Sequence, residues 1–400
     1  MSSSPVNPNA VFTRRHDLDW LRIIAFGLLI FYHVGMFYVP WGWHVKSVHA
    51  GEGLEPLMRL LNPWRLSLLF FISGVAFSYL YDKLGGWRFA RERALRLLPV
   101  IVFGMLVVVM PQTYFQLREM GEIEPGILAF WPDYITSWEI AGITVPTWNH
   151  LWYVVYLFVY ALLLAPMMVA LKAFANGPGA WLARLWEGRL GPLWLILLPF
   201  LPLMAYRIFL TPHWETTHNL TSDWANHAIS FTFVLYGVFA ARSERFWTGV
   251  DRALPYALSL AAGLGAILTP VWIYWDAFAD QPVALWIARA GRVLYAWTVI
   301  LALLGLARRF LTGDGPMRRY LTEAIFPVYI LHQTVTVAAG YALTRMGFGV
   351  GAEFVLVVLA TLAGSFLGFE LIRRIKPLRP VFGLKLEAAR KAPAARSAEA

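Results

Sequence analysis

The chain has 400 residues, of which 58% are hydrophobic and only 14% charged, and its formal net charge is +10. This composition excludes a soluble protein of two or three domains and indicates one that crosses the membrane several times. Cysteine is absent, which excludes disulfides, thiolate metal ligands and a cysteine nucleophile. We also predict no metal site of another kind and no permanently bound cofactor.

Ten apolar segments are long enough, or nearly so, to cross the hydrocarbon core of a bilayer. The first follows a polar stretch without a small-residue cleavage site, so we expect a retained helix and not a cleaved signal. The ten segments are Trp20–Val39, Trp64–Tyr81, Leu97–Gln112, Asn149–Leu171, Leu190–Leu210, Ala228–Ala241, Ala253–Trp275, Ala284–Ala307, Tyr320–Leu343 and Ala352–Ile372.

Ten crossings place both termini on one side of the membrane. That side carries 25 lysine and arginine residues, against 4 in the loops of the opposite side. The positive-inside rule then predicts cytoplasmic termini, and it explains the net charge without a nucleic-acid partner. We expect an all-α, multi-pass helix bundle with a cytoplasmic segment at 1–16, a transmembrane domain at 17–376 and a basic, disordered cytoplasmic tail at 377–400.

The first helix carries two groups that are costly in a membrane, Arg22 and His33. They are eleven residues apart, which corresponds to a rise of about 16 Å and a rotation of about 20°, so they share one face. Arg22 lies near the inner surface and His33 in the outer half. Snorkelling to lipid phosphate also explains Arg22, and a hydrogen bond between helices also explains His33. A neutral imidazole at that depth is able to accept a proton from a hydroxyl group.

His332 lies twelve residues beyond the cytoplasmic start of the ninth segment, and His33 lies thirteen beyond the start of the first. The two histidines are therefore expected at a similar depth, although the sequence does not show whether they face each other. A structural role is the alternative for His332. In the same helix, Glu323 is expected to pair with an arginine.

Two further residues are expected in the outer part of the bundle. Arg65 follows the start of the second segment, where a guanidinium group binds a carboxylate or an acyl oxygen, or else snorkels outward. His150 precedes a run of aromatic residues at the outer boundary of the fourth segment. His150 either binds a substrate or packs at the membrane interface.

An arginine cluster, GGWRFARERALRLLP, follows the second segment on the predicted cytoplasmic side. Membrane topology alone explains such a cluster. A site for a phosphorylated ligand is the second interpretation, because Arg93 and Arg96 are three residues apart on one helix face and guanidinium groups match phosphate oxygens.

In combination and in this order, these motifs resemble the membrane-bound acyltransferase 3 family. The resemblance extends from about residue 17 to 373, and the WHVKS and PQ motifs are most similar to the branch of the glucan biosynthesis protein C, a periplasmic glucan succinyltransferase. The matching motifs are Asp19, Arg22 and His33; RLSLLFFISG from Arg65; Arg93 and Arg96 before Leu97-Leu98-Pro99; HLWYV from His150; and VYILHQ from Val328 to Gln333.

The resemblance implies a bacterial inner-membrane enzyme that transfers an acyl group, succinyl or acetyl, from cytoplasmic acyl-CoA to a hydroxyl of an extracytoplasmic glycan. It implies that Arg22, Arg93 and Arg96 bind the CoA phosphates and that His33, Arg65 and His332 are catalytic, with His150 at the substrate. Transfer through an acyl-histidine is an open alternative to direct transfer. A proton-coupled transporter and a non-catalytic partner of a glycan synthase are the competing functions, although no inverted repeat supports a transporter.

Overall fold

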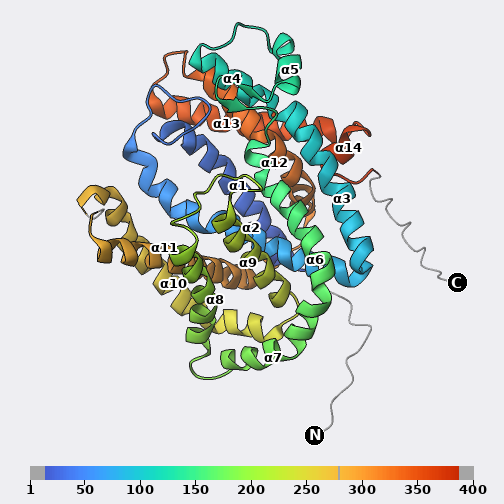
Figure 1. Cartoon of the computed structure of the whole chain (residues 1–400), viewed down its shortest axis with the longest axis vertical. Helices are drawn as coiled ribbons and strands as arrows, with labels where there is room; N and C mark the ends of the chain where they lie inside the picture. The colour runs from blue at the N-terminus through green and yellow to red at the C-terminus, as the bar shows by residue number, and fades with distance from the viewer. Residues whose placement is uncertain (1–13, 278–279, 387–400) are drawn as a thin grey trace, which may run out of the picture.

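The structure is a computed structural model that describes residues 14–277 and 280–386 of the chain. Apart from one short β-hairpin, the regular secondary structure of the described residues is helical (Figure 1). Eight helical segments within them are long and apolar enough to cross a membrane. The prediction of an all-α, multi-pass bundle is therefore confirmed, and the cytoplasmic orientation of the termini stays a prediction.

The α-helices follow the chain in the order shown in Figure 1. Their bounds are α1 His16–Tyr38, α2 Glu55–Leu84, α3 Gly86–Phe103, α4 Met110–Met120, α5 Ile127–Thr136, α6 Trp152–Asn176, α7 Pro178–Leu182, α8 Gly191–Phe209, α9 Trp224–Ala240, α10 Glu244–Ile273, α11 Pro282–Phe310, α12 Pro316–Leu343, α13 Val350–Ile372 and α14 Leu378–Val381. The hairpin consists of β1 Glu139–Ile140 and β2 Ile143–Thr144, which pair antiparallel.

Each of the ten predicted apolar segments coincides with a helical segment. Eight of them are the segments that satisfy length and hydropathy, and the other two are α9 and α12. The α9 helix has only 17 residues, whereas α12 has 28 but begins with charged side chains. Both pack inside the bundle, α9 against α2 and α12 against α1, α4 and α13.

The third segment is longer than predicted, because α3 and α4 are joined through a π-helical turn at Gly104–Val108. A Cβ atom on Gly104 would lie 2.3 Å from the Leu151 side chain, so glycine allows α3 to approach the start of α6. Single π-turns are frequent at functional sites. The turn here precedes the stretch of α4 that carries Gln112 and Gln116.

Two glycines allow α2 and α9 to pack backbone to backbone. A Cβ atom on Gly74 would lie 2.0 Å from the carbonyl oxygen of Val234, and one on Gly237 would lie 2.0 Å from that of Phe71. Small residues are the usual means of close helix contact in membranes, where hydrophobicity alone does not drive association. This contact fixes α2, and with it Arg65, inside the bundle.

Ion pairs fix α12 against its neighbours. Arg318, which is 2% exposed, pairs with Asp19 of α1 at 2.5 Å and with Asp314 at 2.7 Å. The predicted partner for Glu323 is confirmed, because Arg373 and Arg379 each lie 3.5 Å from its carboxylate. A buried arginine with two carboxylates is strongly held, since losing either partner leaves an uncompensated charge.

The loop after α1 folds back over the end of that helix. The Lys46 ammonium donates to the carbonyl oxygens of Met36 and Val39 at 2.7 and 2.6 Å, which satisfies carbonyls that a helix end leaves free. Ser47 donates to the buried carboxylate of Glu353 on α13. The WHVKS stretch therefore anchors the C-terminal end of α1, five residues beyond His33.

Part of the segment that we predicted as a disordered tail is structured. Arg379 of α14 donates to the carbonyl oxygens of Lys385 and Arg373 at 2.6 and 2.7 Å, and the ring of Phe382 lies 5.5 Å from that of Phe103. The rest of the predicted tail, from residue 387, and residues 1–13 of the predicted N-terminal segment lie outside the described residues.

Candidate active site

His33 and His332 face each other across the contact between α1 and α12. The Nδ1 atom of His33 lies 2.7 Å from Nε2 of His332, and the rings are stacked with centroids 4.8 Å apart. His332 is fully buried, whereas His33 lines a cavity. The similar depth predicted for the two histidines is thus accompanied by direct contact, which the sequence did not show.

The hydrogen-bond partners of this pair determine which ring nitrogens carry protons. His332 Nδ1 faces the carbonyl oxygen of Tyr329, which only accepts, so Nδ1 of His332 carries the proton. In the neutral ring, Nε2 of His332 then accepts a hydrogen bond from the Nδ1–H group of His33. The remaining nitrogen of His33, Nε2, is left with a lone pair. That nitrogen is the one available to a substrate.

His150 lies against His332 but has both ring nitrogens engaged. Its Nε2 atom lies 3.0 Å from the carbonyl oxygen of Ile330, and its Nδ1 atom lies 3.3 Å from the side-chain nitrogen of Gln112. The rings of His150 and His332 meet edge to face at 5.4 Å. His150 also lines the cavity, so it lies in the predicted region. Its hydrogen bond to Ile330 holds it against α12.

A buried amide network extends from His150 across α4 and α12. The Gln112 carbonyl oxygen accepts from Asn149 at 3.1 Å and from Gln333 at 3.0 Å, and the Gln333 amide also lies 3.0 Å from Nε2 of His44. His44 Nδ1 lies 2.6 Å from the Gln116 carbonyl oxygen. Burial lowers the pKa of His44, which keeps the ring neutral and lets Nε2 accept from Gln333.

Arg65 reaches the same region from α2. It is 3% exposed, its guanidinium carbon lies 3.6 Å from the centre of the Tyr32 ring, and its Nε and Nη1 atoms have no hydrogen-bond partner. Buried donors without partners are rare in proteins and mark sites where a ligand completes the hydrogen bonding. Arg65 therefore offers a cation and free donors beside His33.

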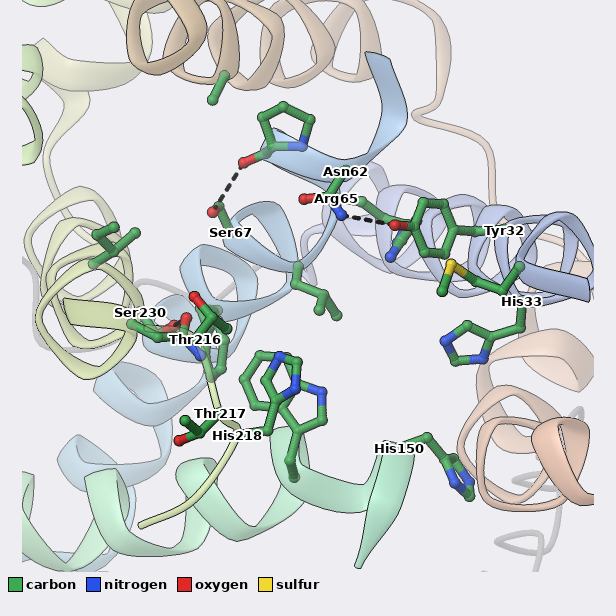
Figure 2. A pocket seen from close by; sticks show the side chains of 18 of the residues that line it. Tyr32, His33, Asn62, Arg65, Ser67, His150, Thr216, Thr217, His218 and Ser230 are labelled. Carbon is green, nitrogen blue, oxygen red and sulfur yellow. Dashed lines mark hydrogen bonds between the residues drawn. The ribbon is translucent and has the colours of Figure 1, made fainter. Parts of the chain in front are cut away.

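These residues line a cavity of about 730 Å³, which we call the histidine cavity. Figure 2 shows His33 and Arg65 on one side of it and Thr217, His218 and Ser230 on the other. The loop before α9 covers it, held by the buried Asp223, which accepts hydrogen bonds from the backbone of Thr217 and His218. Four tryptophans also line the cavity, namely Trp41, Trp43, Trp148 and Trp152.

A second cavity of about 830 Å³, which we call the basic cavity, lies at the other end of α1. Arg22 lines it with a buried Nε atom that has no hydrogen-bond partner. Two acidic side chains, Asp19 and Asp82, are also in its wall. The other basic residues that line it are Arg14, Arg15, Lys83 and Arg242.

Of the three arginines predicted to bind phosphate, only Arg22 lines this cavity. Arg93 is paired with Glu92 one residue before it, and Arg96 is exposed on α3. The charges that act on Arg96 nevertheless include those of Arg93 and Arg22, so the three lie in one electrostatic neighbourhood. The structure therefore brings the predicted arginines to one end of the bundle, but it does not gather them in one pocket.

The family model described as "Acyltransferase domain" matches residues 15–370, which is most of the chain and includes every residue that lines the two cavities except Arg14. The chain belongs to the acyltransferase 3 family. It is thus a multi-pass membrane acyltransferase, and the transporter and scaffold alternatives are set aside. Neither the curated proteins nor the solved structures contain a match.

The two cavities of this acyltransferase share no lining residue. Between Arg22 and His33, α1 carries the buried Phe26, whose ring lies 5.0 Å from that of Tyr329 and 6.2 Å from that of Tyr153. The Tyr153 ring also lies 4.8 Å from that of Phe70, which lines the histidine cavity, whereas none of these three rings lines the basic cavity. We call Phe26, Tyr153 and Tyr329 the aromatic barrier.

Several residues of the acyltransferase site carried no signal in the sequence. Arg207 and Arg292 line the histidine cavity from α8 and α11, yet Arg207 is the only charged residue of its helix and Arg292 has only Arg289 as a charged neighbour within its apolar run. His44 and Gln112 belong to the WHVKS and PQ motifs, which indicated a resemblance and no role. Only the folded bundle brings them to His33 and His332.

Proposed function

We propose that this acyltransferase transfers an acyl group, succinyl or acetyl, from cytoplasmic acyl-CoA to a hydroxyl group of an extracytoplasmic glycan. Osmoregulated periplasmic glucan is the acceptor that we propose, and the bacterial inner membrane is the proposed location. The observation that carries the proposal is the free Nε2 atom of His33, which faces a cavity and is fixed in its tautomer by His332.

The separation of the two cavities supports an acyl-CoA donor. Arg22 and His33 are eleven residues apart on one helix, a rise of about 16 Å. In acyl-CoA, the charged phosphates and the reactive thioester lie at opposite ends of an extended pantetheine arm. With the phosphates at the basic cavity, the thioester is able to reach His33, provided that the aromatic barrier lets the arm pass.

We propose direct transfer with His33 as general base. His33 Nε2 removes the proton of the acceptor hydroxyl, whose oxygen forms a bond with the thioester carbonyl carbon. Arg65 donates to the negatively charged carbonyl oxygen of the tetrahedral intermediate. The carbon–sulfur bond then breaks, and the CoA thiolate takes the proton back from His33. His332 shares the positive charge that His33 carries between these two steps.

An acyl-histidine is the second route that this geometry supports, because Nε2 of His33 is also the atom that would attack the thioester. In that route, a proton reaches the leaving thiolate from water. A single-turnover experiment without acceptor separates the two routes: release of one equivalent of CoA with acylation of His33 supports the acyl-histidine, and its absence supports direct transfer.

For the phosphates of the donor, we propose Arg22 together with Arg15 and Lys83, which line the basic cavity. Guanidinium groups bind phosphate oxygens through paired hydrogen bonds. Arg93 and Arg96 add positive charge at the same end and attract the nucleotide. This assignment extends the three arginines of the sequence-based prediction by two residues that line the cavity itself.

A sugar acceptor suits the lining of the histidine cavity. Tryptophan rings pack against the apolar faces of sugar rings, and the cavity offers four of them with threonine, serine and asparagine side chains between. His150 is a positioning residue in this proposal, because its two nitrogens hold Ile330 and Gln112.

The test is acyl transfer by the purified full chain in proteoliposomes, with succinyl-CoA or acetyl-CoA and a periplasmic glucan. His33→Ala should lower the rate about 10²- to 10⁴-fold, because a general base contributes that much. His213→Ala is the matched control, since His213 is exposed and lines neither cavity. An unchanged rate in His33→Ala would remove His33 from the mechanism.

A further inference from the structure

Three arginines line the histidine cavity, and no acidic side chain that the structure describes does. They are Arg65 of α2, Arg207 of α8 and Arg292 of α11. Among the described side chains, none of the three forms an ion pair with a carboxylate, although most other described arginines in the bundle do. The wall of this cavity therefore carries a net positive charge that the described residues leave uncompensated.

The contacts of these arginines are with neutral groups. Arg292 Nη2 donates to the Asn62 carbonyl oxygen at 3.1 Å, and the Asn62 amide donates to the Tyr32 hydroxyl at 2.7 Å. Arg65 packs its guanidinium group on the Tyr32 ring. Arg207 has a buried Nε atom without a hydrogen-bond partner. Neutral partners do not neutralise the positive charges, so no described group offsets the free energy needed to hold these charges within the membrane.

Arg207 and Arg292 contribute two positive charges to the same cavity from different helices. An anion that binds between two like charges stabilises both of them. Arg292 is linked through Asn62 to Tyr32, which lines the same cavity as His33. A substrate with a charged group near its transferred carbonyl or reacting hydroxyl therefore finds partners for both groups in one cavity.

We propose that Arg207 and Arg292 form an anion subsite of the histidine cavity, which binds a carboxylate or phosphate group of a substrate. This inference rests on the proposed function and specifies that one of the two substrates carries a negatively charged group. The anion has two possible sources with the same chemistry. It is either the free carboxylate of a dicarboxylic acyl group on the donor or an acidic substituent on the acceptor glycan.

Transfer kinetics distinguish the two sources. We would measure kcat/KM for succinyl-CoA and acetyl-CoA, each with a neutral glucan and with a glycan that contains uronic acid, for the wild type and Arg207→Gln/Arg292→Gln. A donor carboxylate predicts that the preference for succinyl-CoA over acetyl-CoA falls about tenfold to 150-fold with either acceptor. If the anion belongs to the acceptor, the preference for the acidic glycan over the neutral glucan should fall by the same factor, whichever donor is used.

Control variants separate a subsite from a general effect of charge. Arg309→Gln removes a charge from the far end of the same helix, where Arg309 is exposed and lines neither cavity, so both preferences should stay at the wild-type values. Arg292→Lys keeps the charge and should recover part of the lost preference. Equal losses for all four substrate pairs, or no change in either preference, would overturn the subsite.

A binding measurement keeps this inference separate from the proposed function. Succinate and inorganic phosphate should raise the thermal unfolding midpoint of the wild-type chain in detergent more than that of Arg207→Gln/Arg292→Gln. If the wild type transfers no acyl group but shows this difference, the proposed function fails and the anion subsite stands. If transfer is observed and neither anion distinguishes the two proteins, the subsite fails and the function stands.

Discussion

Replacing His332 by alanine tests the histidine pair most directly. In the native protein, His332 Nε2 accepts a hydrogen bond from His33 Nδ1, with 2.7 Å between the two nitrogen atoms. When His33 takes a proton from the acceptor, this contact becomes a hydrogen bond from a cation. Such a bond contributes about 1.5 to 3 kcal/mol, and 1.36 kcal/mol corresponds to a tenfold change in rate. His332→Ala should therefore lower kcat/KM for acyl transfer about tenfold to 150-fold.

The assay is release of CoA thiol coupled to glycan acylation in proteoliposomes, with the reconstituted protein quantified. His332→Gln should be faster than His332→Ala, because the glutamine carbonyl oxygen still accepts from His33. The decisive comparison is with the double variant. If His332 acts only through His33, His33→Ala/His332→Ala has the same residual activity as His33→Ala alone.

Two outcomes would refute this reasoning. A wild-type rate in His332→Ala would show that the contact does not assist the reaction. A double variant that loses a further tenfold or more relative to His33→Ala would show that His332 acts independently of His33. The melting temperatures of the variants in detergent should accompany the rates, because the substituted ring is fully buried and its removal leaves a void.

Three further predictions concern the aromatic barrier, the close contact of α2 and α9, and the buried arginine of α12. Phe26→Trp should lower acyl transfer by filling the route between the cavities, whereas Phe26→Leu should raise hydrolysis of acyl-CoA in the absence of glycan; equal rates in both variants would contradict a barrier. Gly74→Ala should lower the stability in detergent by at least about 1 to 3 kcal/mol, because its Cβ meets the backbone of α9, while Gly263→Ala, with nothing within 4 Å, should be neutral or stabilising; similar melting temperatures would contradict the close contact. Arg318→Gln should destabilise the protein by about 1.5 to 3 kcal/mol, since it removes the charged hydrogen bonds of a 2% exposed side chain to Asp19 and Asp314, which keep Arg14 and Arg319 as partners, and Arg319→Gln, 60% exposed, should change the stability by less than about 1 kcal/mol; equal effects would show that burial does not matter here.

The helices were predictable because the bilayer demands apolar runs of a minimum length, and every predicted run is a helix in the structure. The depth of His33 and His332 was predictable for a related reason, since it follows from counting residues along each helix. Their contact was not predictable, because the rotation of α1 against α12 depends on packing and on the ion pair of Arg318 with Asp19.

The proposed phosphate site also shows a limit of prediction from the sequence. Arg93 and Arg96 are neighbours on one helix face, so the sequence favoured them. The basic cavity is instead formed by α1, α2 and the residues before α1, which are distant in the sequence. The anion subsite had no local signal, because Arg207 and Arg292 come from two helices that are distant in the sequence, and neither helix shows which arginine faces the cavity.

The aromatic barrier has a consequence for the energetics of the cell. A water-filled channel through the bundle would let protons run down their gradient and dissipate the energy stored across the membrane. Phe26, Tyr153 and Tyr329 instead fill the space between the two cavities with rings. In the proposed reaction only a slender, uncharged arm has to pass them, so the nucleotide never leaves its compartment and the membrane keeps its insulation during turnover.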